Sequence, residues 1–187
     1  MGSGGLPGGV VGDWQALVER LIAERGSRLV AYGGMLVSRG DDAEDLVHDA
    51  IVKTFGRRRA IRDVDHAEAY VRRVMPTIAI DRARSRASRR RATDRAFERE
   101  DHGVDLEASL DVRRALQDLT PRERACIVLR YFDDLTVPQI AAQLGIAEGT
   151  VKRYLADASG RLAGLLAVEP TPNETVRVSS APGKEQR

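Results

Sequence analysis

Residue types that form disulfides, aromatic cores or metal sites are scarce in this sequence of 187 residues. It has one cysteine, Cys126, so no disulfide can form within the chain, and its place in an apolar stretch predicts a buried core residue. Aromatic residues make up only 4% of the chain, which favours helices packed through Leu, Val, Ile and Ala over aromatic-rich sheets. The three histidines are scattered without metal-ligand spacing, so no metal site is predicted.

Long apolar runs and catalytic motifs are also missing from the sequence. No run is long enough to cross a bilayer, and the glycine-rich, uncharged N-terminus lacks the pattern of a signal peptide. There is no metal-ligand cluster, nucleophile–base motif or phosphate-binding loop of the Gly-x-x-x-x-Gly-Lys type. We therefore expect a cytoplasmic protein with no membrane insertion, which is not an enzyme and needs no cofactor.

Charge is nearly balanced over the whole chain, at a formal net charge of +2, but it is strongly segregated. Residues 13–55 hold five basic and eight acidic side chains, whereas residues 57–99 hold fourteen arginines and six acidic side chains. Residues 100–120 are acidic again, and residues 121–167 are close to neutral. Such asymmetry indicates one surface for a polyanion and a different surface for a protein partner.

Residues 119–155, LTPRERACIVLRYFDDLTVPQIAAQLGIAEGTVKRYL, have the signals of a helix-turn-helix. Thr120 is a predicted N-cap, Pro121 suits the first helical position, and Glu123 can close a capping box. These residues predict a supporting helix that precedes the two helices of the motif.

The pair 133–134 (Asp-Asp) interrupts the supporting helix, and Thr136 is the predicted cap of a shorter one. Gly145 can stop that helix in the left-handed conformation, and the next helix is expected to begin near Glu148. Two helices joined by a short turn with glycine are the DNA-reading unit of many regulators.

Helical spacing predicts which side chains of the last helix could meet DNA. If Val151 and Leu155 face inward, the polar residues of its first turns face outward, where a recognition helix enters the major groove. Arg and Lys can bind guanine or phosphate, Thr can reach phosphate or a thymine methyl, and Glu can accept from cytosine. The alternative is an ordinary helical hairpin with a solvated polar face. The candidate DNA-binding residues here are Glu148, Gly149, Thr150, Lys152 and Arg153.

Residues 41–55, DDAEDLVHDAIVKTF, predict an amphipathic helix with an acidic face. Five acidic residues lie between Asp41 and Asp49, and those beyond the first turn are too far along to serve the helix dipole. One interpretation is a solvated face; the other is a docking face for a basic protein surface. One straight helix cannot wrap its carboxylates round an ion, so metal binding is not favoured.

Polar, arginine-rich residues 57–66 precede a long basic helix predicted from Ala67 onward. Pro76 falls within this stretch, and a proline inside a helix removes a hydrogen bond and should kink the helix near Arg72 and Arg73. The alternative is a helix that begins at, or restarts just before, Pro76. Earlier in the chain, Gly26 and Ser27 are expected to break the first helical segment.

Three of these blocks, taken in order, resemble one family, the sigma-70 superfamily of RNA polymerase sigma factors and in particular its extracytoplasmic-function (ECF) group. DDAEDLVHDAIVKTF is similar to the region-two helix that docks on the clamp helices of the polymerase β′ subunit. EAYVRRVMPTIAIDRARSR is similar to the segment that binds the −10 promoter element, although Pro76-Thr77 stands where the group usually has Arg-Asn. Residues 119–155 are similar to region four, which reads the −35 element.

The resemblance implies an alternative sigma factor that binds core RNA polymerase, at the β′ clamp helices and the β flap, and that also binds promoter DNA. An anti-sigma factor is a further candidate partner. The competing hypothesis is a free-standing helix-turn-helix regulator that does not join polymerase. The implied docking residues are Asp41, Asp42, Asp45, Asp49 and Val52. The implied −10 contacts are Arg57, Arg58, Arg62, Arg72, Arg73, Thr77, Arg82 and Arg84.

The expected fold is all-α, with two small helical domains joined by a flexible linker and a helix-turn-helix in the second. The predicted limits are a disordered tail at 1–12, a region-two domain at 13–88, a linker at 89–104, a region-four domain at 105–167 and a second disordered tail at 168–187.

Overall fold

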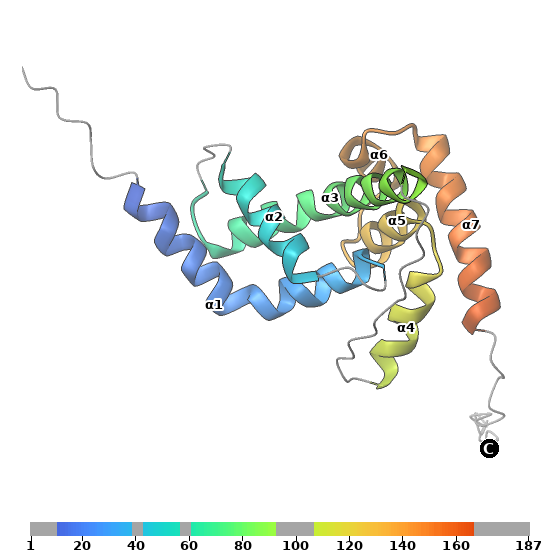
Figure 1. The fold of residues 1–187 in the computed structure, drawn as a ribbon, viewed down its shortest axis with the longest axis horizontal. Helices are drawn as coiled ribbons and strands as arrows, with labels where there is room; N and C mark the ends of the chain where they lie inside the picture. Colours follow the sequence, from blue (N-terminus) through green and yellow to red (C-terminus); the bar gives the residue numbers. More distant parts are fainter. Residues whose placement is uncertain (1–10, 39–42, 57–60, 93–106, 167–187) are drawn as a thin grey trace, which may run out of the picture.

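The computed structural model describes residues 11–38, 43–56, 61–92 and 107–166 (Figure 1). Every regular element in these ranges is an α-helix, which confirms the predicted all-helical fold. The helices are α1 (Val11–Leu36), α2 (Ala43–Phe55), α3 (Val64–Ala92), α4 (Glu107–Gln117), α5 (Pro121–Tyr131), α6 (Val137–Leu144) and α7 (Glu148–Leu166). We call α1–α3 the N-terminal half and α4–α7 the C-terminal half. None of the described helices is long and apolar enough to cross a membrane.

Helix α1 runs without interruption through Gly26 and Ser27, so the predicted break there is wrong. A glycine inside a helix costs only about 1 kcal/mol, which tertiary packing can offset. Leu21 and Leu29, one on each side of Gly26, are fully buried and hold the two parts of the helix against the same core.

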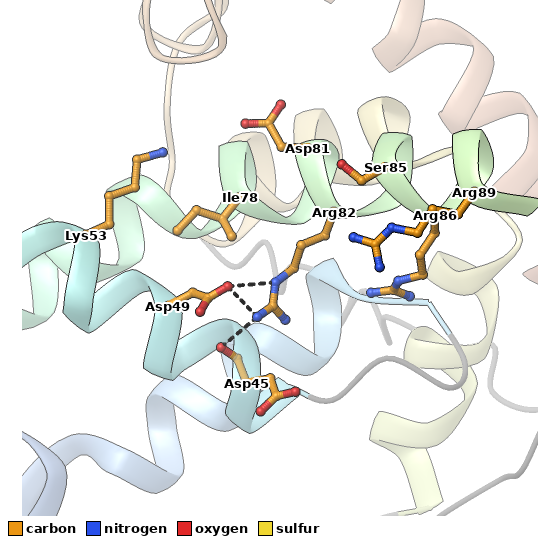
Figure 2. A pocket seen from close by; sticks show the side chains of 9 residues that line it. All are labelled: Asp45, Asp49, Lys53, Ile78, Asp81, Arg82, Ser85, Arg86 and Arg89. Carbon is orange, nitrogen blue, oxygen red and sulfur yellow. Dashed lines mark hydrogen bonds and ion pairs between the residues drawn. The ribbon is translucent and has the colours of Figure 1, made fainter.

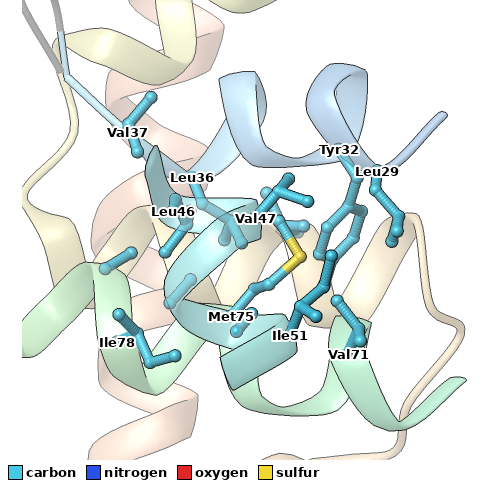
Figure 3. Close-up of a cluster of buried hydrophobic side chains, with 14 of the residues drawn as sticks. Leu29, Tyr32, Leu36, Val37, Leu46, Val47, Ile51, Val71, Met75 and Ile78 are labelled. Carbon is cyan, nitrogen blue, oxygen red and sulfur yellow. The ribbon is translucent and has the colours of Figure 1, made fainter. Parts of the chain in front are cut away.

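The core of the N-terminal half lies where α1, α2 and α3 pack on one another (Figure 3). Figure 3 shows Met75 of α3 among Val47 and Ile51 of α2 and Tyr32 of α1. Gly33 allows this close approach, because a Cβ added there would lie 3.2 Å from both the Ala43 carbonyl oxygen and the Met75 methyl carbon. The apolar stripe predicted for the acidic helix is therefore the surface by which α2 is held in the fold.

Helix α3 begins earlier than predicted and passes through its proline. Asp63 caps it, with Oδ1 accepting a hydrogen bond from the His66 N–H at 2.8 Å, so the helix begins at Val64 rather than Ala67. Pro76 lies inside one continuous helix and is fully buried, which rules out a helix that starts at the proline. Helix α3 also continues through residues 89–92, into the segment predicted as a linker.

Local capping signals set the limits of the helices in the C-terminal half. The Thr120 N–H donates to Glu123 Oε2 at 2.9 Å, and the Glu123 N–H donates back to Thr120 Oγ1, so the predicted capping box and the start of α5 at Pro121 are confirmed. Gly145 ends α6 with φ = 65°, the left-handed conformation predicted for it. The turn then delivers the chain to α7, which begins at Glu148.

The two halves pack against each other through α5, which contacts both α1 and α3, and through α6, which contacts α3 (Figure 1). One buried apolar cluster includes Leu36 and Ala79 from the N-terminal half together with Leu116, Val128 and Ala158 from the C-terminal half. A second cluster, around Leu129, Ile140 and Val151, belongs to the helix-turn-helix itself. The helix-turn-helix therefore has its own small core and also packs on the N-terminal half.

A buried arginine joins the two halves at the centre of this contact. Arg124 of α5 is 2% exposed and donates hydrogen bonds to backbone carbonyls near the ends of two other helices. Its Nη1 also donates to Ser38 Oγ at 3.1 Å. Burial lowers the pKa of Arg124 to about 10, so the guanidinium is still charged at neutral pH. The carbonyl acceptors are those of Leu36, Leu116, Gln117 and Leu119.

Candidate nucleic-acid and polymerase interfaces

The first turns of α7 carry the polar face predicted to meet DNA. Val151 is fully buried in the core of the helix-turn-helix, and this fixes the rotation of the helix about its axis. As a consequence Glu148, Gly149, Lys152 and Arg153 are exposed and Thr150 is half-buried. The structure thus brings all five predicted residues to one end of one helix.

Two features prepare this end of α7 for a negatively charged ligand. The Arg153 guanidinium carbon lies 5.5 Å from the centre of the Tyr154 ring, so the aromatic face restrains the arginine without neutralising it. The N-terminus of a helix also presents N–H groups and a positive dipole end, which favour phosphate. An exposed Lys152 and Arg153 beside that end can bind phosphate or the edge of guanine.

The residues implied for the −10 element fall into four groups. Arg62, Arg73 and Arg84 are exposed, whereas Thr77 is half-buried. The side chains of Arg72 and Arg82 are engaged in ion pairs within the chain. The remaining two, Arg57 and Arg58, lie outside the described residues.

Arg82 binds the acidic helix, as Figure 2 shows. Its Nε and Nη2 both donate to Asp49 Oδ2, the former at 3.0 Å, and Nη2 also donates to the Asp45 carbonyl oxygen at 3.1 Å. These residues line an open groove of about 550 Å³ between α2 and α3, where Arg86 and Arg89 also lie. The resemblance implied that Arg82 contacts DNA and that Asp49 contacts a protein partner, and the structure places the two side chains in direct contact with each other.

The acidic face of α2 is available on the surface of the described part of the chain. Asp45 and Asp49 are exposed, and Val52, one turn further along the same face, is 57% exposed. An exposed valine next to carboxylates on the same face offers both apolar area and charge to a partner. The other two predicted docking residues, Asp41 and Asp42, lie outside the described residues.

A charged contact between the two halves was not predicted from the sequence. Arg72 Nη2 lies 2.6 Å from Asp133 Oδ1, and Tyr32 donates its hydroxyl hydrogen to Asp133 Oδ2 at 2.6 Å. The Arg72 guanidinium carbon is 4.4 Å from the centre of the Tyr32 ring. Burial and the adjacent Asp133 raise the pKa of the Tyr32 hydroxyl, so it is a hydrogen-bond donor at any physiological pH. Because these residues are far apart in the sequence, no spacing rule could have joined them.

Among the residues that the structure describes, no three His, Cys, Asp or Glu side chains are grouped to hold an ion. The pKa of the Cys126 thiol is raised to about 11 by burial, which makes it a poor nucleophile. This agrees with its predicted role as a core residue.

Comparison with known proteins gives matches over most of the chain. Residues 109–162 match the family model "Sigma-70, region 4". The chain is 34% identical over 149 residues to an RNA polymerase sigma-E factor of Streptomyces avermitilis, covering 77% of this chain and 82% of that protein. It is 33% identical over 147 residues to the ECF RNA polymerase sigma factor SigL of Mycobacterium tuberculosis, covering 75% of this chain and 83% of that protein.

A solved structure is also similar over most of the chain. It is the sigma factor RpoE from Bartonella quintana, crystallised in complex with the anti-sigma factor NepR. The TM-score is 0.62 at 25% sequence identity, and the match covers 86% of this chain and 100% of the other.

Proposed function

The chain belongs to the ECF group of RNA polymerase sigma factors in the sigma-70 family, and from this premise we propose how its residues divide the work of promoter recognition. Its function is to direct promoter-specific transcription initiation with RNA polymerase, and it is not an enzyme. Sigma factors bind core RNA polymerase, which supplies the chemistry, while the sigma subunit supplies sequence recognition.

Reading of the −35 element is assigned to the exposed first turns of α7. The observation that carries this assignment is the burial of Val151, which turns Lys152 and Arg153 outward beside the N-terminus of the helix. Side chains in that position reach base edges in the major groove. The exposed Glu148 and the half-buried Thr150 flank them and can add contacts to cytosine or phosphate.

Reading of the −10 element is assigned to the basic face of α3. Arg73 and Arg84 are exposed there and can bind backbone phosphates, which gives affinity that depends on salt. Pro76 is fully buried in this arrangement, so it is not offered as a DNA contact. Sequence preference at this element is assigned to half-buried Thr77 together with the arginines implied for the −10 element.

Docking on core polymerase is assigned to the acidic face of α2. Asp45, Asp49 and the exposed Val52 form a surface suited to the β′ clamp helices. The C-terminal half is expected to sit near the β flap, and the protein is expected to act in the cytoplasm. An anti-sigma factor is a proposed further partner, because the similar RpoE structure was crystallised with one.

The assignment of α7 is tested by run-off transcription from a promoter library with core polymerase and this chain. Lys152→Ala and Arg153→Ala should each weaken the preference at −35 by about 1–3 kcal/mol if the contact is to a base, and leave the preference at −10 unchanged. Arg114→Ala is the matched control, because Arg114 is an exposed arginine on α4, away from this face. A −35 preference equal to wild type in both variants would remove these residues from base reading.

A free-standing regulator is distinguished from a sigma factor by the same reaction. A sigma factor gives specific transcripts only when core polymerase and this chain are both present. The competing hypothesis predicts tight binding of an operator by the chain alone and no new transcript start with core polymerase.

A further inference from the structure

The contact among Tyr32, Arg72 and Asp133 has the form of an occupied anion site. Arg72 and Tyr32 belong to the N-terminal half, and each gives a donor to a different oxygen of one carboxylate, both at 2.6 Å. The third residue, Asp133, comes from the C-terminal half, in the turn between α5 and α6. Two fixed donors that converge on two oxygens of one anion are what a phosphodiester, with its two non-bridging oxygens, also requires.

The donors of this site are held in place by their own half. Tyr32 is 3% exposed within the core of the N-terminal half, and its ring supports the Arg72 guanidinium at 4.4 Å. Arg72 projects from the same helix as the exposed Arg73, on the basic helix proposed to follow DNA. Arg72, Arg73 and Asp133 also line one groove, so the site lies beside a second, exposed arginine.

The carboxylate, by contrast, is presented on a short turn that is itself well defined. The N–H groups of Phe132 and Asp133 both donate to the Val128 carbonyl oxygen, and the Leu135 N–H donates to that of Leu129. Asp134 adopts φ = 52°, a left-handed conformation that aspartate tolerates better than most residues. The turn places the Asp133 side chain against Arg72 and Tyr32, where it is only 17% exposed.

We propose that Arg72 and Tyr32 form a binding site for a backbone phosphate of promoter DNA, and that Asp133 fills this site in the free chain as an internal competitor. The inference rests on the proposed role of α3 in reading the −10 element. Because Asp133 belongs to the C-terminal half, the same carboxylate that blocks the phosphate site also holds the two halves together. A groove of about 470 Å³ beside it, lined by Arg73, Gln139 and Gln143 among others, marks the seam that must open.

Removing the charge of Asp133 is the direct test. A fluorescein-labelled DNA single strand of mixed sequence, about 20 nucleotides long, is titrated with the full-length chain and followed by fluorescence anisotropy. Asp133→Asn should bind the DNA strand about tenfold more tightly than wild type. A tenfold gain corresponds to an anion site that Asp133 leaves free in about a tenth of the wild-type molecules. The dependence of affinity on salt should steepen by about 0.7 in the log–log slope, the value for one more phosphate contact.

Asp134→Asn is the matched control. It changes the net charge by the same amount at the neighbouring position, Asp134 is exposed, and asparagine tolerates its positive φ. A gain of equal size in Asp134→Asn would mean that the net charge alone is responsible, and would overturn the proposal. So would unchanged affinity in Asp133→Asn.

The donors are tested in the Asp133→Asn background. Arg72→Gln and Tyr32→Phe should each remove most of the gain, because each deletes one donor of the phosphate site, and neither should change the thermal unfolding temperature enough to indicate loss of fold. A gain in affinity that survives both substitutions would show that some other surface, and not the Arg72–Tyr32 site, is exposed when Asp133 is replaced.

Run-off transcription by the wild type with core polymerase distinguishes failure of the proposed anion site from failure of the proposed sigma-factor function. If transcription succeeds and Asp133→Asn binds like wild type, the anion site fails alone. If transcription fails, the proposed function fails.

Discussion

At the scale of single residues, Arg124 shows how one buried charge can join the two halves through hydrogen bonds to backbone carbonyls. One guanidinium donates five hydrogen bonds, four to backbone carbonyls and one to Ser38 Oγ. Most of these acceptors lie at the C-terminal ends of α1 and α4, where carbonyls lack partners and the helix dipoles are negative. The positive charge is stabilised by these oriented carbonyl dipoles. Burial lowers the pKa of Arg124, and the nearby negative charge of Asp118 partly offsets that lowering.

Replacing this arginine should therefore destabilise the whole chain. Arg124→Met keeps much of the apolar stem but leaves the carbonyls unpaired, and we expect the free energy of unfolding to fall by about 3 kcal/mol. Arg122→Met is the control, since Arg122 is exposed on the same helix and should change stability by less than about 0.5 kcal/mol. Urea denaturation followed by circular dichroism measures both. Similar losses in the two variants would contradict the role given to Arg124.

The roles of residues that contact near neighbours in the sequence could be predicted. The roles of residues that connect the N-terminal half with the C-terminal half could not. The roles of Thr120, Glu123 and Gly145 depend on neighbours within a few positions, so the sequence predicts them correctly. Arg124 and Asp133 have partners many positions away, and no local pattern reveals these contacts. The one available sign for Arg124 was its place beside Ile127 and Val128 on an otherwise apolar helix face.

At the scale of helices, burial on the tertiary core decides where local signals disagree with the structure. Gly26 does not break α1, because the apolar residues on both sides pack on the same core. Pro76 does not end α3, and its full burial shows that the ring fills space there. Sequence patterns placed α5, α6 and α7 better, since each begins or ends at a cap or turn whose chemistry is local.

Two glycines of the helix-turn-helix should respond in opposite ways to replacement by alanine, because only one of them needs a positive φ. Gly145→Ala should cost about 1 kcal/mol, because φ = 65° is strained for any residue with a Cβ. Gly149→Ala should instead raise the free energy of unfolding by about 0.5 kcal/mol, since Gly149 lies in α7, has no positive φ, and an added Cβ meets no atom within 4 Å. Thermal and urea unfolding of the two variants checks the signs. Destabilisation by Gly149→Ala would mean that the N-terminus of α7 is less helical than described.

At the scale of the whole molecule, the charge pattern predicted two surfaces, and the structure adds how closely they meet. Arg82 of the basic helix binds Asp49 of the acidic helix, so the proposed −10 surface and the proposed docking surface share an edge. Asp133 likewise joins the proposed reading unit for −35 to the proposed reading helix for −10. Sequence alone could indicate each surface but not these contacts, because they depend on how the helices are arranged in space.

The division of DNA reading between α3 and α7 is tested most directly by transcription from a library randomised upstream of the start site. Core polymerase with the wild-type chain should select two separate blocks of sequence, one near −10 and one near −35, at a preferred spacing. Combining Lys152→Ala with Arg153→Ala should erase the block near −35 and leave the other in place. Selection of a single block, or loss of both blocks together in the double variant, would contradict a separate reading role for α7.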